Sequence, residues 1–257
     1  MIELINITHH YGIKPTLRNV NLTVNTGELL CVMGPNGMGK STLLSIAAGL
    51  FSPIQGEVKI HGKVRRSTIE TEKAIRRKIV YLSDSPWLPP SVTGREYLFA
   101  IGRMYRVEED RLFDHVDKLL DLFDLTDNAD SDMSGYSTGQ KKKIGICGAL
   151  VTESPVMILD EPFSGGLDSS ALRVLHQFLA KLAQRQDITI MMAVPVPELV
   201  EDLAHRIAII KDGQIAACAT AEELKNQTQT QTLSDALEQI IHPDGNKHVD
   251  DYFEVSS

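Results

Sequence analysis

The sequence predicts an α/β fold in which a mostly parallel, buried sheet is interrupted by a helical subdomain. Two observations carry this prediction. Short apolar runs rich in β-branched residues alternate along the chain with segments of helical periodicity, and such alternation is typical of parallel sheets covered by helices on both faces. The region from about residue 93 to residue 125 is helical in pattern and rich in charge, and it interrupts the series of strands.

The expected elements follow in chain order. Strand patterns occur at IELINI, NVNLTV, GELLCVMG and GEVKIHG, and the helical pattern STLLSIAAGL places Leu43, Leu44, Ala47 and Leu50 on one face. KIVYLSD is a further strand before the helical region. PVMILDEP, DITIMMAV and RIAIIKDGQI return to strands, and the last contains an Asp-Gly hairpin turn. PELVEDLA is expected to be helical, as is TLSDALEQII in the polar C-terminal segment.

The composition of the chain limits the classes of function that it can have. The chain has 257 residues, of which 42% are hydrophobic, and a formal net charge of −8, which argues against a general nucleic-acid-binding face. Cys31, Cys147 and Cys218 lack metal-ligand spacing and are expected to be reduced thiols of a cytosolic protein. The N-terminus has no signal-peptide pattern, and no apolar run approaches the roughly 18 residues that span a bilayer. A partner must therefore hold the protein at any membrane where it works.

The clearest motif is GPNGMGKST, residues 34–42, which lies between the strand ELLCVM and the helix STLLSIAAGL and matches the P-loop pattern G-x-x-x-x-G-K-[ST]. Backbone N–H groups of such a loop, together with the N-terminus of the helix that follows, form a site for phosphates. We expect Lys40 to reach the β- and γ-phosphates, Ser41 to coordinate Mg²⁺ and Thr42 to lie near the α-phosphate. The other loop residues expected at the nucleotide are Gly34, Asn36, Gly37 and Gly39.

A second motif, VMILDEP, ends an apolar strand in the two carboxylates Asp160 and Glu161. Ligands bind at the carboxyl ends of parallel strands, so both carboxylates should lie beside the phosphate loop. Asp160 fits a role in binding Mg²⁺ through water, and Glu161 fits the base that orients or deprotonates the attacking water. The alternative is an Asp-Glu pair that caps the turn at Pro162.

The segment SGYSTGQKKKIGICGAL precedes the second motif and contains the pentapeptide YSTGQ. YSTGQ resembles LSGGQ, the signature motif of the ATP-binding-cassette (ABC) ATPases: Ser137, Gly139 and Gln140 match, and the first and third positions depart. FSGGLDSS resembles the D-loop of that family, with Asp168 at its acidic position. Tyr11 in HHYG resembles the aromatic residue that stacks on adenine.

This resemblance covers the chain to about residue 225. It implies a P-loop NTPase (RecA-like) core with an antiparallel β-subdomain, an α-helical subdomain inserted at about 84–150, and a polar tail over 226–257. It also implies ATP hydrolysis with Mg²⁺ in a homo- or heterodimer that holds two ATP molecules between its subunits. In such dimers the signature closes on the ATP of the other subunit. From the residues alone, Ser137 is either a second anion site at a helix start or a plain helix cap.

Two positions depart from the family. Asp84 stands where a glutamine is usual and is expected to help hold Mg²⁺, although a shift of one residue would place Ser83 or Ser85 there. Pro195 stands where the family usually has a histidine that contacts the γ-phosphate, and proline has neither a side-chain donor nor a backbone N–H. His205 lies too far along the chain to substitute. We therefore expect normal ATP binding and slowed hydrolysis.

The helical insert and the loop before it contain much of the aromatic content of the chain, at Trp87, Tyr97, Phe99 and Tyr105. In transporters of this family, the corresponding surface receives a short helix of a separate transmembrane permease subunit. Trp87 lies among prolines, which suits a rigid docking loop. The alternative for these aromatic residues is the core of the subdomain.

The C-terminal AEELKNQTQTQTLSDALEQII resembles the tails of ATPases paired with ABC-2-type export membrane subunits, which favours an exporter over an importer. Such a subunit would be cytoplasmic and peripheral on the inner face of the cell membrane. A soluble ABC ATPase of a cytosolic assembly and a regulatory ATP-binding subunit with little turnover are the alternatives. Lys141, Lys142 and Lys143 are expected to form a solvated helix face near the phosphates, and no nucleic-acid partner is expected.

Overall fold

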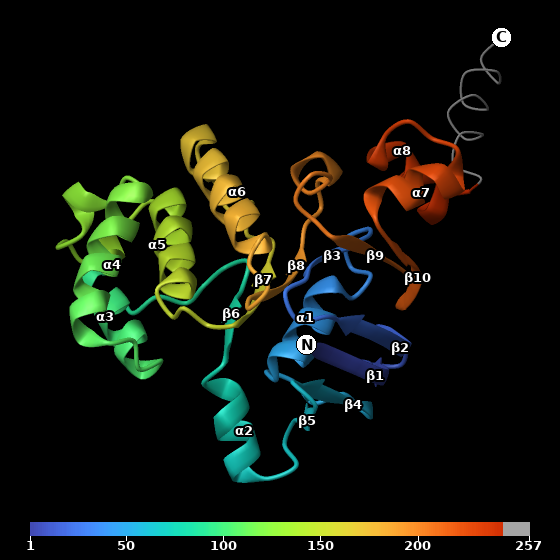
Figure 1. Cartoon of the computed structure of the whole chain (residues 1–257), viewed down its shortest axis with the longest axis horizontal. Coiled ribbons are helices and arrows are strands. Elements are labelled where there is room, and N and C mark those ends of the chain that lie inside the picture. Colours follow the sequence, from blue (N-terminus) through green and yellow to red (C-terminus); the bar gives the residue numbers. More distant parts are fainter. Residues whose placement is uncertain (244–257) are drawn as a thin grey trace.

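The computed structural model describes residues 1–243 and contains two sheets (Figure 1). The small sheet is antiparallel, with strand order β2-β1-β4-β5. Its strands are β1 (Ile2–His9), β2 (Leu17–Val24), β4 (Gln55–Ile60) and β5 (Lys63–Val64). It forms the antiparallel β-subdomain that the family resemblance implied.

The large sheet has the strand order β10-β9-β3-β8-β7-β6, and all of its pairings are parallel except that of β10 with β9. Its strands are β3 (Leu29–Met33), β6 (Ile79–Leu82), β7 (Val156–Asp160), β8 (Thr189–Ala193), β9 (Arg206–Lys211) and β10 (Gln214–Ala219). Because β3, β7 and β8 are parallel neighbours, their carboxyl ends meet at one edge of the sheet. This edge is where the predicted α/β core places its ligand.

Helices lie on both sides of the large sheet (Figure 1). They are α1 (Lys40–Ala48), α2 (Ile69–Arg76), α3 (Gly94–Met104), α4 (Glu109–Leu122), α5 (Thr138–Leu150), α6 (Ser169–Ala183), α7 (Ala221–Thr228) and α8 (Leu233–Ile241). α3 and α4, with α5 beside them, form the helical subdomain at the left of the view. α3 begins at a capping box, in which the Thr93 hydroxyl accepts a hydrogen bond from the Glu96 N–H at 3.2 Å. The predicted helical region is confirmed.

The core is divided between the two faces of the large sheet. Leu30 and Val32 of β3 pack with α1 and the small sheet, whereas Cys31 and Met33 face the cluster that includes the helical subdomain. Every residue of α1 except Ser41 is buried, because the helix lies between the sheets. The expectation of a single apolar face is therefore wrong for this helix. Leu50 lies beyond the helix and is 52% exposed, since Gly49 ends the helix in the left-handed region at φ 82°.

Most predicted strands and the hairpin turn are present. Asp212 and Gly213 both have positive φ, 49° and 74°, as a two-residue type I′ turn requires. The expected helix at PELVEDLA is wrong: only a short 3₁₀ turn, Pro197–Leu199, forms there. The chain then turns into β9, and the N–H of His205 donates to the Leu29 carbonyl at 2.9 Å.

The C-terminal part contains more helix than the sequence suggested. α8 confirms the predicted TLSDALEQII helix, while α7, which crosses the expected boundary at residue 225, was not predicted. Leu224 and Leu233 are buried against the larger core, so both helices are docked on it. The remainder of the predicted tail, residues 244–257, lies outside the described residues.

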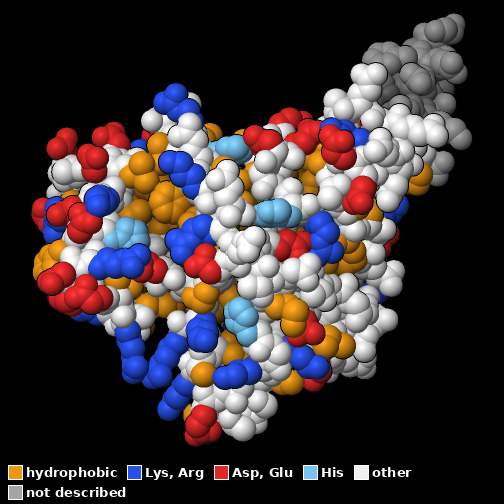
Figure 2. Space-filling view, in the orientation of Figure 1, with side chains coloured by type: hydrophobic (Ala, Val, Ile, Leu, Met, Phe, Trp, Pro, Cys, Tyr) orange, Lys and Arg blue, Asp and Glu red, His pale blue; other side chains and the backbone are white. Residues whose placement is uncertain are grey.

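The face of the molecule in Figure 2 carries charges of both signs. Acidic side chains gather at its left edge, over the helical subdomain, where α4 alone contributes the acidic residues Glu109, Asp110, Asp114, Asp117 and Asp121. Within residues 1–243, none of the helices combines the length and apolar character needed to cross a bilayer.

Candidate functional site

The phosphate loop joins β3 to α1 and lines an open pocket of about 440 Å³. Gly34, Gly37 and Gly39 have φ values of 144°, 79° and 100°, a region that residues with a Cβ rarely adopt. These glycines let the backbone turn its N–H groups toward the pocket. The pocket is lined by Tyr11, Thr16, Asn36, Gly37, Gly39, Lys40, Ser41, Thr42 and Glu161. The structure thus brings together residues of the loop, of the segment after β1 and of the end of β7.

Lys40 is 5% exposed and binds only neutral oxygens among the described residues. Its Nζ donates to the Gly34 carbonyl at 2.7 Å, the Pro35 carbonyl at 3.1 Å and the Asn36 Oδ1 at 3.4 Å. Burial lowers the pKa of Lys40, and the nearby carboxylates of Glu161 and Asp160 oppose that shift. A buried ammonium group without a close carboxylate partner suits an anion such as a phosphate placed in the loop.

Asp160 at the end of β7 is 4% exposed, and its partners are hydroxyl groups. The Ser41 Oγ donates to its Oδ1 at 3.1 Å, and the Tyr81 hydroxyl lies 3.4 Å from its Oδ2. Burial raises the pKa of Asp160, the two hydroxyls lower it, and the negative charge of Asp84 raises it again. A hydroxyl and a buried carboxylate are ligands that Mg²⁺ accepts, completed by the phosphates of the substrate. The residues present therefore fit Mg²⁺.

Glu161 follows β7 directly and lines the same pocket as Lys40. Its φ is 46°, in the left-handed region, which costs a non-glycine residue on the order of 1 kcal/mol or more. Its N–H donates to the carbonyl of Ala193 in β8 at 3.0 Å, so the turn after β7 is tied to the neighbouring strand. The turn thus places the Glu161 side chain at the phosphate loop. Neither carboxylate caps the turn at Pro162 through a recorded hydrogen bond among the described residues.

Tyr11 lies at the rim of the pocket and is 65% exposed. Its hydroxyl is 3.3 Å from the Thr42 Oγ1, and its ring packs edge-on against His9 at a centroid distance of 4.9 Å. The ring is thereby held beside the loop and remains open to solvent. Stacking on adenine stays a prediction.

The residues of the signature motif lie outside this pocket within one chain. The Ser137 Oγ accepts from the Gln140 N–H at 3.2 Å, and the Gln140 Oε1 accepts from the Ser137 N–H at 2.9 Å. This capping box begins α5, so Ser137 is a helix cap in the single chain. Gly139 packs so closely on the carbonyl of Gly166 that an added Cβ would lie 2.7 Å from that oxygen. Roles of Ser137, Gly139 and Gln140 at a nucleotide stay predictions.

Asp168 also lies outside the pocket and is the N-cap of α6. Its Oδ1 accepts from the Ala171 N–H at 2.8 Å, and its Oδ2 pairs with the Lys143 Nζ at 2.7 Å. These bonds lower the pKa of Asp168, with the Lys143 hydrogen bond as the largest cause. A contact of Asp168 with ATP stays a prediction.

The expectation of a solvated lysine face on α5 is wrong for two of the three lysines. Lys142 is 2% exposed and Lys143 is 8% exposed, and only Lys141 is exposed. The sequence suggests three equivalent residues, but α5 packs against the loops that follow β6 and β7. Each buried ammonium group meets a carboxylate there: Lys143 meets Asp168, and Lys142 meets Asp84.

Asp84 and Pro195 both lie near the carboxyl edge of the large sheet. The Asp84 side chain is 49% exposed, and its Oδ1 accepts from the Ser164 hydroxyl and from Lys142. The Lys142 ammonium joins the carbonyls of Asp84 and Glu161, but coordination of Mg²⁺ by Asp84 stays a prediction. Pro195 is exposed two residues beyond β8, whose Ala193 pairs with Asp160. A histidine at this position would emerge near Asp160 and Glu161.

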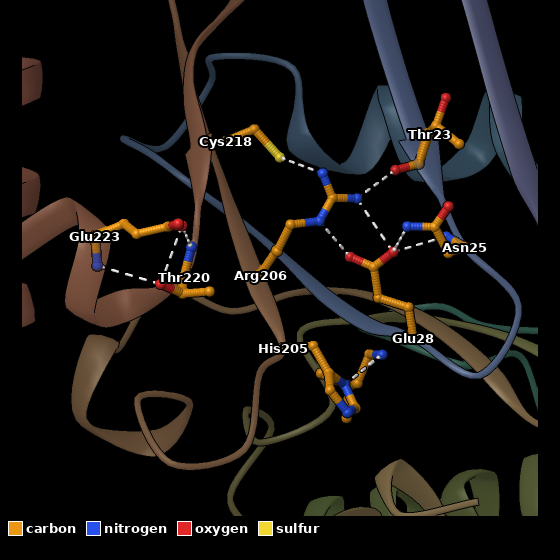
Figure 3. Close-up of polar contacts among 9 residues, drawn as sticks. Thr23, Asn25, Glu28, His205, Arg206, Cys218, Thr220 and Glu223 are labelled. Atoms are coloured by element: carbon orange, nitrogen blue, oxygen red, sulfur yellow. Dashed lines mark hydrogen bonds and ion pairs between the residues drawn. The ribbon is translucent and has the colours of Figure 1, made fainter. Parts of the chain in front are cut away.

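His205 lies at the opposite edge of the sheet, where β3 begins (Figure 3). Its Nδ1 accepts from the Leu29 N–H at 2.9 Å, beside the ion pair between Arg206 and Glu28. The phosphate loop leaves β3 at its other end. His205 therefore does not replace the missing histidine.

Sequence reasoning missed several residues of the site. Thr16 lines the pocket, Tyr81 contacts Asp160, and Ser164 and Lys142 both contact the Glu161 carbonyl. Tyr81 offered a signal, because it is the polar-tipped residue of a strand that neighbours β7. Lys142 offered none beyond its place in a run of lysines.

A protein-family model described as ABC transporter matches residues 17–164. The daunorubicin resistance ATP-binding protein DrrA3 of Streptomyces coeruleorubidus is 31% identical over 218 residues, which cover 85% of this chain and 67% of that protein. The sulfate/thiosulfate import ATP-binding protein CysA of Bradyrhizobium diazoefficiens is 33% identical over 234 residues, covering 89% and 66%. A dimeric post-hydrolysis structure of the ATP-binding cassette MJ0796 with ADP and Pi matches with a TM-score of 0.76 and 27% identity, over 86% of this chain and 98% of that one. The chain therefore belongs to the ABC transporter family, as an ATP-binding, ATP-hydrolysing cassette.

Proposed function

We propose that the chain energises an exporter by hydrolysing ATP and that it acts through a separate transmembrane permease subunit. The observation that carries the catalytic part is the meeting of Lys40, Ser41 and Glu161 at one pocket, with Asp160 hydrogen-bonded to Ser41. The direction of transport rests on weaker support. One relative is named for daunorubicin resistance, and the helices α7 and α8 form the segment that resembles exporter tails. Another relative is named for import, so the exporter assignment is part of the proposal.

The residues divide the chemistry between binding and activation. Lys40 and the loop N–H groups bind the β- and γ-phosphates, and Ser41 and Asp160 hold Mg²⁺. When bound, Mg²⁺ neutralises charge on the phosphate oxygens. Glu161 orients the attacking water and takes its proton. Pro195 supplies no donor to the developing charge, so we expect this step to be slow compared with a cassette that has the histidine.

The complete site requires a second ATPase subunit. Ser137 and Gly139 lie at the N-terminus of α5, whose N–H groups are suited to an anion. Neither residue lines the phosphate pocket of its own chain. We infer that they close on the γ-phosphate held by the second subunit, with Asp168 nearby. The dimeric form of the MJ0796 cassette supports this arrangement. The second subunit is either another copy or an unlike ATPase.

The permease subunit docks beside Trp87, which is 81% exposed. A groove of about 220 Å³ adjoins it, and Tyr97, Ile101 and Tyr105 line this groove together with Pro86. Tyr97 and Phe99 are partly buried against the hydrophobic core. The alternative interpretation, that they belong to the core of the subdomain, therefore applies to part of each side chain. Trp87 is an exposed aromatic anchor next to a recess, a pattern typical of a helix-docking site. This docking places the chain at the inner face of the cell membrane.

Trp87→Ala tests this docking. When Trp87 is replaced by alanine in the full chain, produced in its source cells, a smaller share of the protein is expected to co-sediment with membranes. The reason is the loss of the aromatic anchor. Ile69→Ala is the matched control, since Ile69 is 70% exposed on α2, outside the groove. Equal recovery of the Trp87→Ala variant and the natural chain would contradict the docking site.

Pro195 favours one second candidate, a regulatory ATP-binding subunit of a heterodimer. In that case the chain binds ATP and scarcely hydrolyses it, and the partner carries the complete site. Glu161 opposes this alternative, because a site without turnover has no use for the base.

A further inference from the structure

Lys142 lies at the meeting point of three loops around the catalytic carboxylates. Its Nζ donates to the Asp84 carbonyl at 2.7 Å and the Glu161 carbonyl at 2.9 Å. It also lies 3.4 Å from the Asp84 Oδ1 and 3.4 Å from the Ser164 Oγ. One ammonium group thus joins α5 to the segment after β6, to the turn after β7 and to the loop that leads to α6.

The surroundings of Lys142 form a built site for its side chain. A Cβ added at Gly165 would lie 3.2 Å from the Lys142 Cδ, so the aliphatic part packs against this backbone. Burial lowers the pKa of Lys142, and the charge and hydrogen bond of Asp84 oppose that shift. A buried ammonium group is costly unless hydrogen bonds satisfy it. Here two carbonyls accept from it, and a carboxylate and a hydroxyl lie 3.4 Å away, so the position is specific to a donor of this length.

The contact with Glu161 bears on the geometry of catalysis. The φ of Glu161 is in the left-handed region, and its carbonyl accepts from Lys142 and lies 2.8 Å from the Ser164 Oγ. On the other side, its N–H is bonded to the Ala193 carbonyl. The peptide groups on both sides of Glu161 are therefore fixed, and they set the direction in which its carboxylate leaves the backbone. Strained conformations of this kind persist where the surroundings hold them.

We propose that Lys142 is a positioning residue for ATP hydrolysis, which holds the backbone of Glu161 so that its carboxylate faces the attacking water. This inference rests on the proposed role of Glu161 as the base. Lys142 does not line the phosphate pocket, so its effect is on the hydrolysis step and not on ATP binding. Its bond to Asp84 ties the same geometry to the segment that leads into the helical subdomain. A movement of that subdomain is thereby transmitted to Glu161.

The test compares Lys142→Met with the natural chain, using ATP turnover and the affinity for ATP measured separately. We expect kcat to fall about 10- to 100-fold, because small misplacements of a reacting group have effects of that size. The Kd for ATP should stay within about twofold. A fall in kcat without a change in Kd indicates the loss of an interaction needed only in the transition state. Lys142→Arg, which keeps the charge and the donors, should recover part of the rate. Lys141→Met is the matched control on the exposed side of α5 and should behave like the natural chain.

The outcomes separate this inference from the proposed function. If Glu161→Gln leaves turnover intact, the assignment of the base is wrong, and the inference fails with it. If Glu161→Gln abolishes turnover while Lys142→Met keeps the natural kcat, only the inference about Lys142 is overturned. A parallel loss of kcat and ATP affinity would also overturn it, since that indicates a merely structural role. Should Lys142→Met fail to fold, Lys142→Gln, which retains an N–H donor, is judged by the same split.

Discussion

At the scale of single residues, the phosphate pocket depends on a few side chains whose partners are fixed by the fold. The ammonium group of Lys40 is surrounded by neutral oxygens, and the carboxylate of Asp160 by hydroxyls. In the proposed function, the phosphates of ATP and Mg²⁺ would supply the opposite charges for these two buried groups. Pro195 lies near these groups, and it has no polar side chain at a position where the family usually has a histidine.

Pro195→His is expected to raise ATP turnover. The variant places a side-chain donor two residues beyond β8, beside the end of β7 that carries Asp160 and Glu161. A single donor to developing charge changes rates by about 10²–10³-fold in comparable sites, which sets the upper range of the gain. Steady-state hydrolysis with Mg²⁺ measures it. Pro195→Ala is the control, because it restores the backbone N–H without a polar side chain. A Pro195→His variant no faster than the natural chain would refute the interpretation of the missing histidine.

At the scale of elements, the opposite edge of the large sheet is held by polar contacts (Figure 3). The Glu28 carboxylate precedes β3 and pairs with Arg206 at the start of β9 at 2.6 Å. The Arg206 guanidinium also donates to the Thr23 carbonyl of β2 at 2.7 Å, which ties the small sheet to the large one. These contacts therefore tie β2, β3 and β9 to one another at the end of β3 opposite the phosphate loop.

Glu28→Ala is expected to lower the free energy of unfolding by about 3 kcal/mol, because it leaves Arg206 partly buried without its carboxylate. Urea denaturation of the purified chain measures the change. The control is Glu57→Ala, which removes a more exposed ion pair with Lys59 and should change the free energy of unfolding much less. Equal effects of the two substitutions would show that the Glu28–Arg206 pair does not have this role.

The parts of the site that the sequence predicts are those that are local in the chain. The strand, glycine loop and helix around Lys40 are contiguous, and Asp160 and Glu161 end an apolar strand, so their meeting follows from the order of parallel strands. Lys142 could not be singled out, because its burial depends on loops distant in sequence. The helix expected at PELVEDLA failed because its apolar residues Val200 and Leu203 are buried in the core from a turn and not from a helix face. α2 was missed because Ile75 is its one buried residue.

At the scale of the whole molecule, two hydrophobic cores lie on opposite faces of the large sheet. One face packs with α1 and the small sheet, and the other includes the helical subdomain with α5. Asp160 and Glu161 lie at the carboxyl end of β7, and Lys142 of α5 joins the Asp84 and Glu161 carbonyls there. This arrangement fits a cassette in which ATP hydrolysis is coupled to a membrane subunit.

The most direct test of the account is ATP turnover by the purified chain with Mg²⁺, measured beside a Glu161→Gln variant with ATP binding followed in parallel. We predict slow turnover by the natural chain, its loss in the variant by at least about 10²-fold, and similar ATP affinity in both, because Glu161 acts on the attacking water. Turnover that is unchanged in Glu161→Gln would contradict the role of Glu161 as the base, and ATP binding without turnover in the natural chain would contradict hydrolysis by copies of this chain alone.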